Sequence, residues 1–438
     1  MPVDRRRFIL TAGLSVAGGA LAPAATLAER RPSPGAGPPA AARDWTWVRE
    51  QFPASRDWAH FAAFYIVSHP RPVTEAIERL RREIDENPFE VVEHGLFTRP
   101  DEVRRAAAEY LGGRAEEVAL TRCTTEGLAL VYSGLRLRPG QEILTTTHDH
   151  YVHHECVRLA ARRTGAAMRK VALYDEASAA TEDEIVSRLR GALRPETRVV
   201  GVTWVHSSTG VKLPVRRIAE AIAQANAARA AADRILVVVD GAHGFGVEDE
   251  AVAGLGCDFF AAGTHKWIFG PRGTGILWGR PEAWAELQPT VPAFEMGPFE
   301  AWIEAKEPVA TDARAMSPGG FHAYEHMWAL PAAFAFHREI GRAPIAARIR
   351  ELNTRIKEGL AAQRRVKLHT PRDGRVSAGL VCFEVEGLRP EDVVKRLLDK
   401  RIIASTSPYK QSYCRLAGSL LNTPEEVDAA VRAVGALA

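Results

Sequence analysis

The stretch THDHYVHHEC, residues 147–156, holds four histidines and an aspartate, although the chain of 438 residues has only 14 histidines. His150 and His154 are four residues apart, so on a helix they would share one face and could present two imidazoles to one metal ion. No second cluster of Cys, His or carboxylate residues with ligand spacing occurs elsewhere in the sequence. A metal site is therefore one interpretation of this stretch, and other parts of the chain are needed to choose among its possible roles.

Asp240 and Lys266 each follow an apolar run, ILVVV and CDFFAAG respectively. Apolar residues flank Lys266 on both sides, and such surroundings lower the pKa of a lysine and make it an imine-forming amine. Taken alone, Asp240 is equally well explained as a turn former, and a lysine at such a place as a solvated surface residue.

A third group, Cys123-Thr124-Thr125-Glu126, follows the run VALTR. Hydroxyls and free backbone N–H groups at a helix start can hold a phosphate, although simple capping explains them too. The three groups together match the needs of pyridoxal 5'-phosphate (PLP). Lys266 would hold its aldehyde as a Schiff base, Asp240 would keep its ring nitrogen protonated, and the helix start would bind its phosphate.

A scaffold must bring these strand ends together. Short apolar runs alternate with helical patterns, at residues 118–122, 142–147, 198–205, 235–240, 257–263 and 273–279. This alternation predicts an α/β domain over residues 71–310, with a parallel sheet covered by helices on both faces. Ligands of such sheets bind beyond the carboxyl ends of the strands.

The remainder, residues 311–438, predicts a smaller α+β domain. We expect one long helix over residues 325–363, a half-buried strand over 378–387, a helix in PEDVVKRLLDK, and strands in RIIAST and YCRLAG. The last helix should start at Thr423, which forms a capping box with Glu426. A ligand would then bind in the crevice between the two domains. Residues 44–70 form an N-terminal segment.

The motifs CTTE, DGAHGFG and GTHKWIFGPRGTG resemble, in this order, those of the class V aminotransferase superfamily. Its members are fold type I PLP enzymes, in which a mostly parallel mixed sheet lies between helices; they include cysteine desulfurases, isopenicillin N epimerase-like proteins, transaminases and lyases. The resemblance covers about residues 60–435. It implies a homodimer with each active site near the subunit interface, and it implies these site residues: Lys266 as the Schiff-base lysine, Asp240 at the pyridine nitrogen, His243 near the cofactor O3', and Thr124, Thr125, Thr264 and His265 around the phosphate.

The same resemblance gives the histidine stretch another role. In the family, an acidic residue is followed by a histidine whose ring stacks on the pyridine and can exchange protons, and here these are Asp149 and His150. His148, His153 and His154 would then line the pocket, or cap and solvate the next helix, and the second role is favoured for His148. This interpretation assigns no metal.

The segment YCRLAGSLLNTPEEVD resembles the closing motif of the family, which makes Arg415 the candidate clamp for a substrate carboxylate. The alternative is a salt-bridged surface arginine. The preceding segment RIIASTSPYKQSY has no cysteine, where desulfurases carry their nucleophile. Ser207, which the resemblance places among the cofactor-binding residues, stands where they have Asn. Both departures argue against a desulfurase and favour the epimerase-like branch.

One more departure concerns the phosphate. Gly319-Gly320-Phe321-His322 replaces the usual Gly-Thr pair that reaches the phosphate of the other subunit. His322 or a backbone amide would take over that contact, or the contact is absent.

The N-terminus combines Arg5-Arg6-Arg7-Phe8 with an apolar run that ends near Ala28, and it resembles a twin-arginine (Tat) signal. We expect a signal over residues 1–28, a Pro/Ala-rich linker over 29–43, and export of the folded protein to the periplasm by the Tat machinery. No stable membrane insertion is expected after cleavage; a membrane anchor is the alternative. The 46% hydrophobic and 25% charged residues with net charge +3 fit a soluble globular protein that binds no nucleic acid.

The function expected from these patterns is that of a PLP-dependent enzyme acting on an amino acid, or on the amino-acid part of a peptide-like metabolite, through Schiff base and quinonoid chemistry. Amino transfer, epimerisation and elimination share this chemistry and stay open. The predicted periplasmic location resembles that of PLP enzymes that act in the maturation of siderophores such as pyoverdine. Two alternatives from other classes are a PLP-binding protein without turnover and a periplasmic His-rich metal-binding protein.

Overall fold

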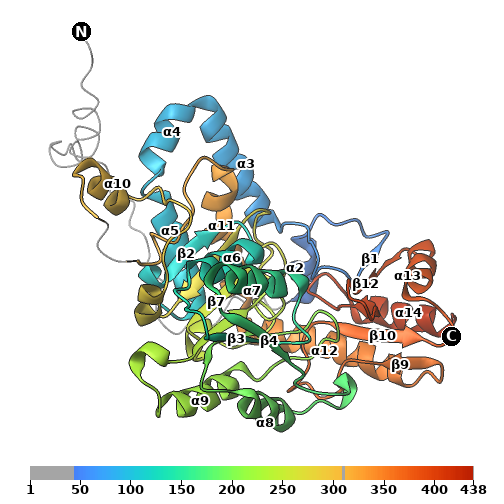
Figure 1. Cartoon of the computed structure of the whole chain (residues 1–438). Coiled ribbons are helices and arrows are strands. Elements are labelled where there is room, and N and C mark those ends of the chain that lie inside the picture. The colour runs from blue at the N-terminus through green and yellow to red at the C-terminus, as the bar shows by residue number, and fades with distance from the viewer. Residues whose placement is uncertain (1–43, 308–310, 438) are drawn as a thin grey trace. The chain divides into compact units, whose positions relative to one another are not determined.

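The computed structural model describes residues 44–307 and 311–437, so the predicted signal (1–28) and linker (29–43) lie outside it. Its main element is a seven-stranded sheet in the order β2-β8-β7-β6-β5-β3-β4 (Figure 1). Strand β8 is antiparallel to β2 and β7, and the other neighbouring pairs are parallel, which confirms a mostly parallel mixed sheet. The strands are β2 (Val118–Thr121), β3 (Glu142–Thr146), β4 (Ala167–Val171), β5 (Thr197–Thr203), β6 (Leu236–Asp240), β7 (Phe259–Gly263) and β8 (Gly275–Gly279).

Helices cover both faces of this sheet, and strand β6 shows why. All five of its residues are buried; Val237 and Val239 pack into one apolar cluster, whereas Leu236 and Val238 pack into another. A strand that is apolar on both faces needs a layer of helices on each. The first cluster includes residues of α3 (Arg71–Glu86), α5 (Arg99–Leu111), α8 (Glu182–Ala192), α9 (Val215–Asn226) and α11 (Tyr324–Ile340), and the second includes α6 (Thr124–Gly134) and α7 (Tyr151–Thr164).

The six apolar runs in the sequence are confirmed as strands, but strand β4 was not predicted. Its sequence AMRKV carries two cations and none of its residues is fully buried, because it lies at the edge of the sheet. A half-exposed edge strand lacks the unbroken apolar pattern that marks its neighbours.

A second, antiparallel sheet has the order β12-β13-β10-β9 and packs with the last helices of the chain. The capping box of Thr423 and Glu426 is formed as predicted at the start of α14. Strand β1 (Ala59–His60) pairs in parallel with β11 (Ile402–Ile403), so the N-terminal segment is joined to this part of the chain. The remaining elements are α2 (Trp45–Glu50), α4 (Pro88–Gly95), α10 (Met296–Ile303), β9 (Val366–Leu368), β10 (Val381–Val385), α13 (Pro390–Asp399), β12 (Ser405–Thr406), β13 (Cys414–Leu416) and α14 (Pro424–Gly435).

The prediction of one helix over residues 325–363 is wrong. Gly341 has φ +93° and ψ 138°, which divides the segment into α11 and α12 (Arg342–Ala361). Helix α11 packs against α3 and α5 of the larger core, and α12 packs against α14 and the second sheet. The predicted domain boundary at residue 310 stays a prediction. None of the described helices has the length and apolar character needed to cross a bilayer.

Candidate active site

The predicted site residues come together beyond the carboxyl ends of the parallel strands. Asp240 is the last residue of β6, Lys266 follows β7, and His150 follows β3. Arg415 reaches the same place from β13 of the second sheet, where its Nη1 donates to the carbonyl of Ser207, which follows β5, at 3.2 Å. The site therefore lies where the two sheets meet, as the sequence predicted.

The amine of Lys266 lies in a partly desolvated place between an anion and a cation. Burial lowers its pKa, the Asp240 carboxylate opposes that change, and the Arg415 guanidinium adds to it. The net effect is a lowered pKa, so more of the amine is neutral and nucleophilic than for a lysine in water. Asp240 is itself buried, and its Oδ1 accepts a hydrogen bond from the Ala242 N–H at 3.0 Å.

His243 has a buried ring nitrogen that makes no hydrogen bond to the described residues. It is buried, and its Nδ1 has no hydrogen-bond partner in the part of the chain that the structure describes. Burial lowers its pKa well below the usual range, and the cations of Lys266 and Arg415 add to the effect. A buried polar atom without a partner is costly, so the site fits a bound group with an oxygen at this point, such as the O3' of PLP.

The start of α6 forms a cradle suited to a phosphate. Cys123 precedes the helix without a side-chain cap, which leaves the first backbone N–H groups free, as at other uncapped helix starts. Thr124 Oγ1 accepts from the Gly263 N–H at 2.8 Å. A Cβ atom on Gly263 would lie 2.8 Å from Cε1 of His265 and 3.4 Å from Thr124 Oγ1, so the glycine keeps this space open.

Two predicted phosphate residues differ in how they are placed. Thr125 is exposed in the first turn of α6, next to the cradle. The hydroxyl of Thr264, in contrast, donates to the carbonyl of Thr274 at 3.0 Å, so it is not free to bind a phosphate in this structure.

Asp149 fixes the loop that carries His150. The Asp149 carboxylate is buried and accepts from Thr145 Oγ1 at 2.6 Å, from the Thr146 N–H at 2.7 Å and from the Thr203 N–H at 2.9 Å. Burial raises its pKa, but nearby histidines and these hydrogen bonds outweigh burial and bring the pKa to about 2. The carboxylate therefore stays charged and holds the loop after β3 to strand β5.

His150 caps helix α7, and its Nδ1 accepts from the Val152 N–H at 3.3 Å. Burial lowers the pKa of His150, while Asp240 opposes this change and Lys266 adds to it. Its ring thus lies close enough to both residues to feel their charges. The stacking of His150 on a bound ring stays a prediction.

The other three histidines of the stretch point to different places. His148 stacks on Tyr174 with ring centroids 3.9 Å apart, His153 is buried against Tyr132, and His154 Nε2 lies 2.7 Å from the Thr146 carbonyl oxygen. The solvated role favoured for His148 is wrong, because the ring is half-buried in this stack. Among the described residues, no group of three or more His, Cys, Asp or Glu could hold a metal ion. The spread of these rings argues against the metal interpretation.

Arg415 is a buried cation whose partners are all neutral. It donates to Ser405 Oγ at 3.1 Å, to the Ser207 carbonyl at 3.2 Å and to the Thr406 carbonyl at 2.8 Å, and its guanidinium lies over the ring of Phe64 at 4.7 Å. The alternative of a salt-bridged surface arginine is wrong. A buried guanidinium without a carboxylate partner among residues 44–307 and 311–437 suits an anionic ligand.

Tyr409 and Phe64 are site residues that the sequence did not reveal. The Tyr409 hydroxyl lies 2.7 Å from Ser207 Oγ, and its ring meets that of His150 edge-on at 6.1 Å. Phe64 meets His243 edge-on at 6.0 Å. Neither residue lies in a motif, and both come from segments remote from the main sheet, so no pattern in the sequence could have found them.

The segment Gly319-Gly320-Phe321-His322 lies beside the start of α6 in its own chain, since the pKa of His322 responds to Arg122 and Glu126. Phe321 is 79% exposed. The contact to the phosphate of another subunit stays a prediction.

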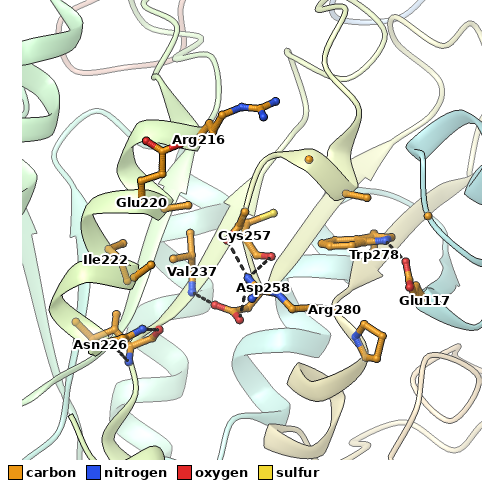
Figure 2. Close-up of a pocket in the computed structure, with 18 of the residues that line it drawn as sticks. Glu117, Arg216, Glu220, Ile222, Asn226, Val237, Cys257, Asp258, Trp278 and Arg280 are labelled. Carbon is orange, nitrogen blue, oxygen red and sulfur yellow. Dashed lines mark hydrogen bonds and ion pairs between the residues drawn. The ribbon is translucent and has the colours of Figure 1, made fainter. Parts of the chain in front are cut away.

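A cavity of about 990 Å³ lies at the amino ends of the parallel strands, next to the first residues of β6 and β7 (Figure 2). Polar groups in it are paired within the protein: Asp258 accepts from the Val237 N–H at 2.8 Å, and Trp278 Nε1 donates to Glu117 at 3.0 Å. The catalytic candidates lie at the other ends of these strands, so this cavity is not part of the active site.

Known proteins with similar sequences include two kinds of enzyme. The chain is 29% identical to isopenicillin N epimerase of Streptomyces clavuligerus over 378 residues, which cover 84% of this chain and 92% of that protein. It is 28% identical over 423 residues to a probable cysteine desulfurase of Xylella fastidiosa, covering 90% and 96% of the two chains.

Solved structures share the fold. A variant of C-DES with glycine covalently linked to its PLP cofactor superposes with a TM-score of 0.78 at 24% identity, covering 88% of this chain and 98% of that one. Cysteine desulfurase CsdA of Escherichia coli gives 0.75 at 22% identity, covering 89% and 97%. The fold is thus that of the fold type I PLP enzymes. The model of the family described as aminotransferase class-V matches residues 69–430, and the chain belongs to this family of PLP-dependent enzymes.

Proposed function

We propose that this protein is an epimerase-like enzyme that removes and returns the α-hydrogen of an amino acid, or of the amino-acid part of a peptide-like metabolite. The observation that carries the proposal is the amine of Lys266, which lies between Asp240 and Arg415 with a lowered pKa. A lowered pKa leaves more of the amine neutral and therefore able to accept a proton as a base. The similarity to isopenicillin N epimerases over most of both chains supports proton transfer at the α-carbon, although cysteine desulfurases are about as similar.

Each residue of the site has a part in this proposal. PLP, when bound, supplies an electron-poor ring that makes the α-hydrogen of an attached amino acid acidic. Lys266 would hold the cofactor and afterwards move the proton at the α-carbon, while Asp240 would keep the ring nitrogen protonated. His243 would bind the ring oxygen, and His150 would cover the ring. The start of α6 with Thr124, Thr125 and His265 would hold the phosphate.

Arg415 would bind the carboxylate of the substrate. It is buried beside Phe64 and bound only to neutral oxygens, so an incoming carboxylate would give it the anionic partner that it lacks. A fixed carboxylate would place the α-carbon next to the Lys266 amine.

We further propose that the protein is not a desulfurase. Cys414, next to Arg415, is buried, and burial raises its pKa to about 12, as it does for Cys156, Cys257 and Cys382. A thiol with such a pKa has almost no thiolate with which to attack sulfur. Cys123 is less buried but precedes α6, on the phosphate side of the site.

Incubation of the purified holoprotein with D- and L-amino acids in D₂O tests the function. We expect deuterium at the α-carbon and inversion of configuration in wild type, and neither in Lys266→Ala, because the amine that moves the proton is gone. Mass spectrometry and chiral chromatography measure the two outcomes. Formation of a keto acid without inversion would instead show amino transfer, and release of sulfide from cysteine would show a lyase or desulfurase.

We also propose a homodimer and export to the periplasm. Tyr65, Tyr151 and Phe321 are each more than two-thirds exposed and would be covered in a dimer, which light scattering would measure. The twin arginines before an apolar run support export, and a role in siderophore maturation would fit that address. Fractionation of cells, and mass spectrometry of exported metabolites with and without the gene, test these two points.

A further inference from the structure

Tyr409 lies at the tip of a tightly held loop. The loop joins β12 to β13, and Ser407 closes it: the Ser407 N–H donates to the Tyr413 carbonyl, and Ser407 Oγ accepts from the Tyr413 N–H, both at 2.9 Å. Ser412 Oγ donates to the Ser407 carbonyl at 2.8 Å. These bonds fix the backbone on both sides of the tip, so the direction of the Tyr409 side chain is set by its own loop.

From this tip, Tyr409 reaches across to the main sheet and meets Ser207. The two hydroxyl oxygens are 2.7 Å apart, and either hydroxyl can donate. Arg415 donates through Nη1 to the carbonyl of the same serine at 3.2 Å. A guanidinium and a phenol therefore converge on the two oxygens of one residue, beside the ring of His150.

Ser207 thus offers one acceptor oxygen to Tyr409 and one to Arg415, and a carboxylate likewise offers two acceptor oxygens. A carboxylate bound by one arginine still has acceptor capacity on its second oxygen, and a buried acceptor requires a donor. Burial raises the pKa of Tyr409, so its hydroxyl keeps its proton at neutral pH and can be that donor. Ser207 is buried under both groups, and a ligand would have to replace its oxygens as their acceptor.

We propose that Tyr409 is a substrate-binding residue whose hydroxyl, together with Arg415, binds the α-carboxylate of the amino-acid substrate in place of Ser207. The inference rests on the proposed function, because it requires a substrate with a free carboxylate. It assigns to this loop a specificity for acids over amides and esters.

Binding without turnover provides the test. The probe is 2-methylalanine, which has no α-hydrogen, with 2-methylalaninamide as the analogue that lacks the carboxylate. The change in absorbance of the bound cofactor gives the dissociation constants for the holoprotein and its variants. We expect Tyr409→Phe to weaken binding of the acid about tenfold to a hundredfold, the usual effect of losing a hydrogen bond to a charged group, and to change binding of the amide less than about threefold.

Ser207→Ala is the matched control, since it breaks the same hydrogen bond from the other side. If Tyr409 binds substrate, the ratio of acid binding to amide binding falls in Tyr409→Phe but not in Ser207→Ala, because in Ser207→Ala the phenol is still present and no longer has a competing partner. Equal weakening by both variants would show a purely structural bond and overturn the inference, and so would equal weakening of acid and amide by Tyr409→Phe. A wild-type holoprotein that binds neither compound would contradict the proposed function and this inference with it.

Discussion

At the scale of single residues, the site is governed by opposing charges around one amine. Asp240 and Arg415 act on the pKa of Lys266 in opposite directions, and burial decides the net effect. Burial lowers the pKa of the His243 imidazole, and the cations Lys266 and Arg415 lower it further. The charge state of each group therefore depends on its neighbours, and single substitutions should shift it in directions that can be stated in advance.

The pair Asp240→Asn and Arg415→Gln should shift the pKa of Lys266 in opposite directions. Asp240 raises this pKa, so replacing it with a neutral residue lowers the pKa, and the amine then reacts at lower pH than in wild type. Arg415 lowers the pKa, so its replacement raises it, and the amine reacts only at higher pH. The measurement is the pH dependence of labelling of residue 266 by trinitrobenzenesulfonate in cofactor-free protein, read from the mass of its peptide. A shift in the same direction for both variants would show that their charges do not control the amine.

Much of this residue set could be predicted from the sequence, and the reason is local. Asp240 ends β6, and His243 and Lys266 lie shortly after the ends of β6 and β7, so a correct strand prediction places all three at the carboxyl ends of parallel strands. Tyr409 and Phe64 could not be predicted in this way. They enter the site from segments whose position depends on the packing of the second sheet, which no local pattern specifies.

At the scale of elements, a single glycine separates two helices that the apolar pattern joins. The spacing of apolar residues continues through Gly341, which is why the sequence predicted one helix over 325–363. Only the backbone shows the break, since Gly341 has φ +93°, a conformation that other residues adopt at a cost. The spacing of apolar residues indicates which face of a segment is buried, and both helices bury a face. Helix α11 packs into the larger core, whereas α12 packs into both the larger core and the core of the second sheet.

Gly341→Ala and Gly191→Ala should therefore change stability with opposite signs. At Gly341 the added methyl requires a strained φ and lies 3.2 Å from Pro344 Cδ, so we expect a loss on the order of 1–3 kcal/mol in the free energy of unfolding. Gly191 lies in α8 with open space around it, and alanine there should stabilise the protein by roughly 0.5–1 kcal/mol. Denaturation by urea measures both. Equal stability of the Gly341 variant and wild type would mean that the break between α11 and α12 is not required.

At the scale of the whole described chain, several histidines are buried in the neutral state. Burial lowers the pKa of His206 to about 3 and that of His337 to about 4, and both side chains are fully buried. In the unfolded chain a histidine titrates near pH 6.5, so between these values the unfolded state binds more protons than the folded state. The stability contributed by these groups is present above about pH 6.5 and is lost as the pH falls toward 4.

We expect the melting temperature of the wild-type protein to fall steadily between about pH 6.5 and 4. His337→Gln should have a flatter profile over this range, because one buried group no longer titrates. Between about pH 6.5 and 4 we expect the variant to lose less free energy of unfolding than wild type, by an amount on the order of 1–3 kcal/mol. Calorimetry at a series of pH values measures this, and His94→Gln, on the exposed face of α4, is the control that should follow wild type. Parallel curves for wild type and His337→Gln would show that His337 does not contribute to acid sensitivity.

The parallel pairing of β1 with β11 sets an order of events during synthesis. Residues 59–60 leave the ribosome early, yet the strand that receives them is made only when nearly the whole chain has emerged. Until then Phe61, which ends in the core of the second sheet, has no native partner there and must be shielded by other means. A ribosome that stops before residue 402 would release a chain whose beginning cannot dock, and such a product should be recognised by proteases or chaperones through its N-terminal part.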